Sequence, residues 1–264
     1  MSVPDPVDER DALARLARVR GPTELQATIL ALITPADSVP SFVAWTAETR
    51  SCANAAVLRE DVTRLSDATR LPCLEIMLDR MRGFSKDERR SLLESTRRVV
   101  AAITPLRPLD RLHWLLMRRK LGEKAPVAQL PDAHNRLDTL PPMMIVRIAG
   151  VAAYVARMVP GPAEGAMWYQ LAMSPVVSPE RMPPCHAPDG DGLARALIEV
   201  EALPWMLRPV LLRAWVDAAF TTGQRARLRP MAADALRLVA DLLESPLPPE
   251  LARHYSELDW ETAR

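Results

Sequence analysis

The clearest pattern of apolar and polar positions lies between residues 85 and 104. Ser85 and Glu88 have the spacing of a capping box, in which the serine hydroxyl accepts one backbone N–H and the glutamate reaches back to another. Leucine, valine and isoleucine then recur at the 3.6-residue period of a helix. Thr104-Pro105 marks the end, because a residue before proline disfavours helical backbone angles. The pattern predicts one amphipathic helix.

Proline and glycine divide the rest of the chain into further predicted helices. Pro72 is placed in the first turn of a helix that ends at Gly83, because proline is tolerated at a helix start and glycine favours a helix end. Thr23 is predicted to cap another helix. The remaining helices are expected at residues 8–19, 23–33, 109–121, 143–158, 164–173, 193–203, 206–221 and 227–243, with two more within 39–65 and a short one from 248.

Composition predicts an all-α fold. The 264 residues include 25 prolines, only 9 glycines and 5% aromatic residues, whereas strands favour aromatic and β-branched residues and hairpins favour glycine turns. The apolar residues are mostly leucine, alanine and methionine, which are good helix formers. We expect four segments: N-terminal helices (1–70), a first helical unit (71–122), a linker, long helix and proline-rich loop (123–192), and a second helical unit (193–264).

An internal repeat relates the two helical units. Leu92-Leu93 and Leu211-Leu212 lie 119 residues apart, and the same offset brings Leu74 onto Leu193. A chance similarity between leucine-rich helices is the alternative. The repeat favours duplication of one unit, because each copy alone leaves an apolar face that needs a partner.

Residues 92–104 and 211–223 both resemble the central helix of TerB-like (tellurite-resistance-type) domains, and residues 236–249 resemble the closing run. Residues 71–79 resemble the entry into the first unit of the tandem TerB-like, non-catalytic C-terminal region of bacterial HtpX-type membrane zinc metallopeptidases. The resemblance covers residues 55–255. It implies a helical bundle built from two repeated TerB-like units plus N-terminal helices, and a stress-related role.

The departures from this family limit what the resemblance implies. The family commonly places an acidic residue and a glycine after the central helix, but here these places hold Ile103-Thr104 and Thr222-Gly223. Hard cations need several oxygen ligands, so metal binding at these turns is not implied. No histidine starts a His-Glu-x-x-His motif. Zinc peptidase activity is therefore not inherited.

Charge and cysteine usage predict a cytoplasmic protein. The formal net charge of +1 disfavours nucleic acid and acidic membranes as partners. Three widely spaced cysteines favour a reducing compartment, and the N-terminus lacks the apolar stretch of a signal peptide. The most apolar stretch carries Arg147 and Arg157. A charge at mid-bilayer is costly, so we expect a packed helix there and no membrane insertion.

One cluster of ligand-capable side chains invites a metal-binding hypothesis: Cys185, His186, Asp189 and Asp191. A calcium-binding EF-hand loop would need further oxygen ligands, and zinc would need a second Cys/His pair. The favoured alternative is a loop in which Asp189 or Asp191 caps the next helix. We therefore predict no metal, no cofactor and no catalytic residue.

His113 lies next to Trp114 and close to Arg111 and Arg118 on a predicted helix. A pH-responsive or anion-binding role is one interpretation of this group. The favoured alternative is a half-buried aromatic beside a solvated basic face.

The functional prediction is a non-catalytic helical interaction or scaffold protein that binds a protein partner or its own copy. Tryptophan concentrates interface energy, so the candidate contact residues are Trp114, Trp168, Trp205, Met206 and Trp215, with structural packing as the alternative role. Two other functions stay open. One is an enzyme or small-molecule binder with a pocket between helical units, and the other is a regulator that binds nucleic acid through its arginine runs.

Overall fold

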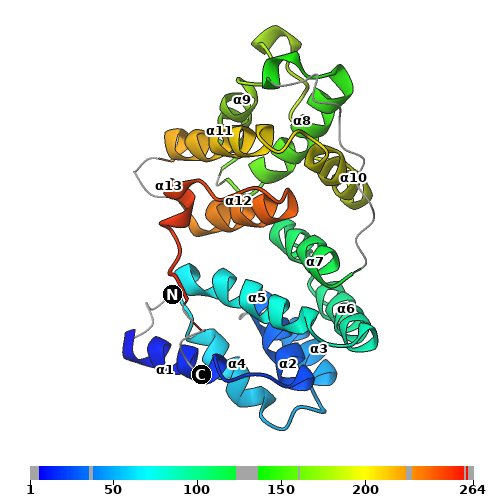
Figure 1. The fold of residues 1–264 in the computed structure, drawn as a ribbon, viewed down its shortest axis with the longest axis vertical. Helices are drawn as coiled ribbons and strands as arrows, with labels where there is room; N and C mark the ends of the chain where they lie inside the picture. Colours follow the sequence, from blue (N-terminus) through cyan, green and yellow to red (C-terminus); the bar gives the residue numbers. More distant parts are fainter. Residues whose placement is uncertain are drawn as a thin grey trace. The chain divides into compact units, whose positions relative to one another are not determined.

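The computed structural model describes residues 6–35, 38–122, 136–159, 161–223, 228–258 and 260. Over these residues the chain forms thirteen α-helices and two short 3-10 helices and contains no strand, so the all-α prediction is confirmed (Figure 1). The helices are α1 (Pro6–Leu16), α2 (Pro22–Ile33), α3 (Val39–Glu48), α4 (Ala55–Thr63), α5 (Asp67–Arg82), α6 (Lys86–Ala101), α7 (Pro108–Leu121), η1 (Leu137–Thr139), α8 (Pro142–Ala156), α9 (Pro162–Met173), η2 (Pro179–Arg181), α10 (Gly190–Glu201), α11 (Leu207–Thr222), α12 (Pro230–Leu242) and α13 (Pro249–Ala252).

The chain divides into two compact units. Unit 1 comprises residues 1–123 together with 255–264, and unit 2 comprises residues 124–254. Unit 1 is therefore built from both ends of the chain. The segment boundaries expected at residues 70 and 192 fall inside α5 and α10, and much of the expected linker, residues 123–135, lies outside the described residues.

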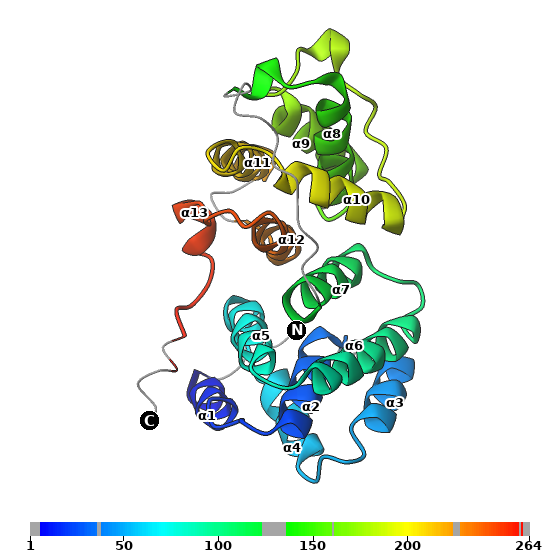
Figure 2. The same cartoon turned by 45° about the vertical axis from the view of Figure 1, so that its right-hand side comes forward.

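In unit 1 the helix α2 packs against α3, α4, α5 and α6 (Figure 2). Around it, α1 packs against α4, α3 against α6, and α7 against both α5 and α6. This arrangement follows from the sequence of α2, whose residues from Ala27 to Ile33 are all buried. A helix that is apolar on all sides belongs in the interior.

In unit 2 the helix α8 packs against α9, α10 and α12, and α11 packs against α9 and α12. Alanines on α8 allow the neighbouring helix to approach closely. At the contact between α8 and α9, a Cβ atom on Gly165 would lie 2.6 Å from the carbonyl oxygen of Ala156. Only glycine therefore fits at this crossing without a shift of the backbone.

The order of packing is similar in the two units. In unit 1, α2 packs against α5, α3 against α6, and α6 against α7; in unit 2, α8 packs against α10, α9 against α11, and α11 against α12. The units also differ, because α7 contacts α5 in unit 1 whereas α12 contacts α8 in unit 2.

The helix ends test several expectations. The capping box is present, because the N–H of Glu88 donates to the Ser85 hydroxyl and the Glu88 carboxylate accepts from the Ser85 N–H. Two expectations are wrong. Gly21 precedes the first residue of α2, so Thr23 does not cap that helix. Pro72 lies inside α5 rather than in its first turn, because the helix begins at Asp67.

None of the helices within the described residues is both long and apolar enough to cross a membrane.

Candidate functional site

The candidate metal ligands do not come together. The carboxylate of Asp189 accepts the Gly192 N–H at 2.7 Å and caps the N-terminus of α10, as the alternative interpretation predicted. Cys185 is an exposed free thiol. In the part of the chain that the structure describes, no group of three or more His, Cys, Asp or Glu side chains is placed to hold a metal ion.

The segment that carries Cys185 instead borders a groove in unit 2. The Tyr169 hydroxyl donates to the Pro183 carbonyl oxygen at 2.7 Å and holds this segment beside α9. Burial, together with a smaller contribution from the nearby Cys185, raises the pKa of Tyr169 to about 12, so the hydroxyl keeps its proton and remains a donor.

The groove has a volume of about 550 Å³. Its lining is mostly small and apolar: Ala153, Ala156, Arg157, Val159, Gly161, Gly165, Ala166, Cys185 and Ala187. Although Cys185 is exposed, partial desolvation beside the groove raises the pKa of its thiol, so the thiolate that nucleophilic chemistry requires is disfavoured. Arg157 stacks over the ring of Tyr154, with 5.3 Å between the guanidinium carbon and the ring centroid. This lining suits an apolar occupant better than acid–base chemistry.

The five candidate contact residues divide into three groups by exposure. Trp168 and Trp215 are fully buried inside unit 2, and the Trp168 indole N–H donates to the Trp215 carbonyl oxygen at 3.1 Å. Both therefore serve the packing role that the sequence left as an alternative, and neither can touch a partner in the folded protein. Trp114 is partly exposed and lies under the guanidinium of Arg97, 5.0 Å from its ring centroid.

Trp205 and Met206 are the exposed members of the set. Trp205 is 71% exposed and Met206 is 62% exposed, at the turn between α10 and α11. Val210, one helical turn further along, is 53% exposed and was missed by the sequence reasoning. The sequence did contain a signal for it. Val210 lies four positions after Met206, on the same side of the helix, and outside the apolar face that Leu211 and Leu212 define. We call Trp205, Met206 and Val210 the α11 surface.

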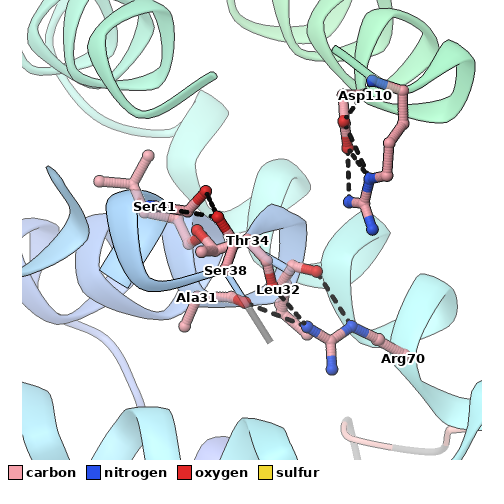
Figure 3. Close-up of polar contacts among 9 residues, drawn as sticks. Ala31, Leu32, Thr34, Ser38, Ser41, Arg70 and Asp110 are labelled. Carbon is pink, nitrogen blue, oxygen red and sulfur yellow. Dashed lines mark hydrogen bonds and ion pairs between the residues drawn. The ribbon is translucent and has the colours of Figure 1, made fainter. Parts of the chain in front are cut away.

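Unit 1 contains a different arrangement, in which one arginine satisfies the carbonyl groups at helix ends. Figure 3 shows the guanidinium of Arg70 facing the end of α2. It donates to the carbonyl oxygens of Leu32 at 3.0 Å and Ala31 at 3.1 Å, and more weakly to that of Thr34 at 3.4 Å. A cation at the C-terminus of a helix is favourable because the carbonyl ends carry partial negative charge.

Two further groups in the same view are structural. The Ser38 hydroxyl accepts the Ser41 N–H at 3.4 Å and caps α3, and the Asp110 carboxylate accepts the Arg107 N–H at 3.0 Å and caps α7 (Figure 3). The Asp110 side chain also accepts from the Arg107 guanidinium at 2.6 Å. The hydrogen bonds of Arg70, Ser38 and Asp110 drawn there thus serve the beginnings and ends of helices.

His113 is buried in the same unit. Its Nδ1 atom has no hydrogen-bond partner among the described residues. Burial lowers its pKa from 6.5 to about 4; Asp110 opposes this shift, while Arg107 and Arg70 reinforce it. The imidazole is therefore neutral near pH 7, so His113 itself lacks the positive charge that the anion-binding interpretation, the less favoured of the two, would need.

No family model, curated protein or solved structure matches this chain. The TerB-like resemblance therefore stays a prediction from the sequence.

Proposed function

We propose that the protein is a non-catalytic helical interaction or scaffold protein, and that the α11 surface binds its protein partner. The observation that carries this proposal is the exposure of Trp205, Met206 and Val210 in one short stretch. Large apolar side chains exposed together are uncommon on soluble proteins, and they typically mark interaction sites.

The side of α11 that carries this surface differs from the side that packs into the core of unit 2. Leu207, Leu211 and Leu212 face inward and are buried, so α11 is anchored through its other side. Met206 and Val210 are four residues apart and therefore share the outward face. Trp205 precedes them at the turn, where an exposed indole can enter a pocket on a partner.

We further infer that the two units arose by duplication of one helical arrangement of the TerB-like kind. The parallel packing of α2, α3, α5, α6 and α7 with α8, α9, α10, α11 and α12 supports this inference. The offset of 119 residues that relates Leu92 to Leu211 supports it as well.

The test uses the full chain, the variant Trp205→Ala and a matched pair of methionine variants. Met206 and Met143 are both methionines that are 62% exposed, and both lie in unit 2. We expect Trp205→Ala and Met206→Ser to weaken association about tenfold or more, because central interface residues dominate binding energy. Met143→Ser should leave association unchanged.

Light scattering of the purified chain reports self-association, and crosslinking followed by pull-down from native lysate reports other partners. The proposal fails if the wild-type chain is strictly monomeric and retains nothing above background. It also fails if Met143→Ser and Met206→Ser weaken association equally.

The groove beside Cys185 supports a second candidate function, the binding of a small apolar molecule. Its volume of about 550 Å³ falls within the range of ligand pockets, roughly 300–1,000 Å³. A thermal-shift screen with fatty acids and other apolar metabolites tests this candidate. A true ligand should lose its effect in Ala166→Leu, in which a larger side chain fills the groove.

A further inference from the structure

Pro72 leaves one backbone carbonyl group of α5 without its usual donor in the helix. Proline has no N–H, so it cannot donate to the carbonyl oxygen four residues earlier, which belongs to Ala68. The Ala68 carbonyl oxygen instead accepts the N–H of Ser256 at 3.0 Å. A residue of the C-terminal segment thus supplies the bond that the helix itself cannot make.

The neighbouring residue strengthens this attachment. Tyr255 is buried, whereas Ser256 and Glu257 are exposed. The segment from 255 to 258 has no helix of its own, and its main chain belongs to unit 1 although the residues before it belong to unit 2. An extended segment that bonds through its main chain and buries an aromatic side chain has the features of a bound peptide.

A second attachment lies further along the segment. The guanidinium carbon of Arg80 lies 4.8 Å from the ring centroid of Trp260. The same guanidinium donates to the carbonyl oxygens of Val19 and Ala17, at 3.1 Å each, at the end of α1. These hydrogen bonds fix the position of the Arg80 guanidinium, so its planar, positively charged group can stack against an aromatic ring.

We propose that the surface of unit 1 around Ala68 and Arg80 is an acceptor site for an extended segment, and that a second copy of this chain can supply its own C-terminal segment there. Exchange of identical segments is a low-cost route to dimers, because each contact in the exchanged form already exists within one copy. The site is separate from the α11 surface and does not depend on it.

The experiment measures binding of a fluorescein-labelled synthetic peptide of residues 253–264 by fluorescence anisotropy. The acceptors are the full chain and a chain that ends at residue 254. We expect saturable binding to the shortened chain and binding at least about tenfold weaker to the full chain, whose own segment occupies the site.

Variants of the peptide leave the acceptor untouched. Ser256→Pro removes the N–H that reaches Ala68, and Trp260→Ala removes the ring over Arg80, so each should weaken binding about threefold to tenfold. Glu257→Ala is the control, because an exposed charge contributes little and its loss should change binding less than about twofold. Equal affinity of all four peptides would overturn the proposal.

The shortened chain must be folded for this test, which circular dichroism checks. If it is not, the full chain carrying Ser256→Pro and Trp260→Ala replaces it as the acceptor, and the same order of peptide affinities is expected. If that chain is unfolded too, the segment is part of the core rather than an exchangeable ligand, and the proposal fails.

Exchange between copies is tested by refolding the full chain at high concentration and measuring its mass by light scattering. We expect refolding to produce an exchanged dimer that is absent before refolding. Ser256→Pro combined with Trp260→Ala should abolish this dimer, and Trp205→Ala, which weakens only association through the α11 surface, should leave it intact. A chain that stays monomeric at every concentration would overturn the exchange. A dimer lost only in Trp205→Ala would support the α11 surface instead.

Discussion

The two units differ in the polar side chains that they bury. Of the eleven buried polar or charged residues among those described, ten lie in unit 1, and only Thr222 lies in unit 2. Buried polar groups are costly unless they are hydrogen-bonded, so unit 1 must satisfy far more of them. Ser41 and Asp110 lie at helix starts, whereas Thr28 Oγ1 and His113 Nδ1 have no hydrogen-bond partner among the described residues. The two units therefore differ in how many polar side chains they bury.

Arginine satisfies helix ends in both units, because Arg208 in unit 2 also donates to the carbonyl oxygen of Leu243, at 2.7 Å, at the end of α12. In unit 1, Arg70 and Arg80 on α5 each donate to carbonyl oxygens at the ends of other helices. In unit 2, Trp168 and Trp215 meet edge to face with 6.3 Å between ring centroids. Removing a buried aromatic side chain leaves a cavity, whereas removing a guanidinium leaves carbonyl groups without their donors.

The largest effect is expected in the aromatic core of unit 2. Trp215→Ala should destabilise the protein by about 3–5 kcal/mol, because it removes a large buried side chain and leaves a cavity. Urea denaturation measures the loss, and amide hydrogen exchange locates it. Faster exchange confined to unit 1 would contradict the assignment of Trp215 to the core of unit 2.

Leucines at equivalent positions of the repeat provide the most direct comparison. Leu92 on α6 and Leu211 on α11 are both fully buried. Each change to alanine should cost about 2–4 kcal/mol, and the two losses should agree within about 1 kcal/mol if the sites correspond. Amide hydrogen exchange should place the first loss in unit 1 and the second in unit 2. If the losses of stability in the two variants differ several-fold, the case for duplication is weakened.

Helix positions could be predicted from the sequence because their signals are local. Ser85 and Glu88 define a helix start within four residues, and the apolar period that follows needs no knowledge of the rest of the chain. Pro72 shows where local reasoning fails. Proline favours a first turn, but here it is tolerated inside α5, and the carbonyl it leaves unpaired bonds to a residue far away in sequence.

The candidate sites were predicted less well, because burial is a tertiary property. Trp168, Trp205 and Trp215 look alike in sequence, yet two of them are buried and one is exposed. The capping role of Asp189 was predictable from its place before a helix. The groove beside Cys185 was not, since small residues from separate helices form it.

Acid should weaken unit 1 through its buried histidine. Burial holds the pKa of folded His113 at about 4, below its usual 6.5, so the unfolded chain takes up this proton first as the pH falls. The free energy of unfolding is therefore unaffected by His113 above pH 6.5 and decreases as the pH falls from 6.5 to 4. At 1.36 kcal/mol per unit, the loss reaches about 2 kcal/mol by pH 5.

The variant His113→Gln isolates this contribution, because glutamine does not titrate. The difference in its unfolding free energy between pH 7 and pH 5 should be smaller than that of the wild type by about 2 kcal/mol. Glu9 and Glu48 have a pKa below the usual 4.5, so the stability that each contributes is lost only at more acidic pH. An unchanged pH dependence in His113→Gln would show that the imidazole is not buried as described.

The smallest effect is expected at Arg70, where it connects the helix ends to the buried histidine. Arg70→Met keeps much of the side-chain volume but removes the donors to Leu32 and Ala31, so it should cost about 1–2 kcal/mol at pH 7. Arg82→Met on the same helix is the control, because the exposed ion pair of Arg82 with Asp79 should contribute less than about 1 kcal/mol.

The same variant should also change the response to acid. The positive charge of Arg70 helps to lower the pKa of His113, so its removal raises that pKa toward 6.5. A raised folded-state pKa narrows the pH range in which the unfolded chain alone binds the proton. Arg70→Met should therefore be less stable than the wild type at pH 7 and yet lose less stability between pH 7 and pH 5. Chemical denaturation at the two pH values measures both quantities, and a larger acid loss in Arg70→Met would contradict the link between the helix cap and the buried histidine.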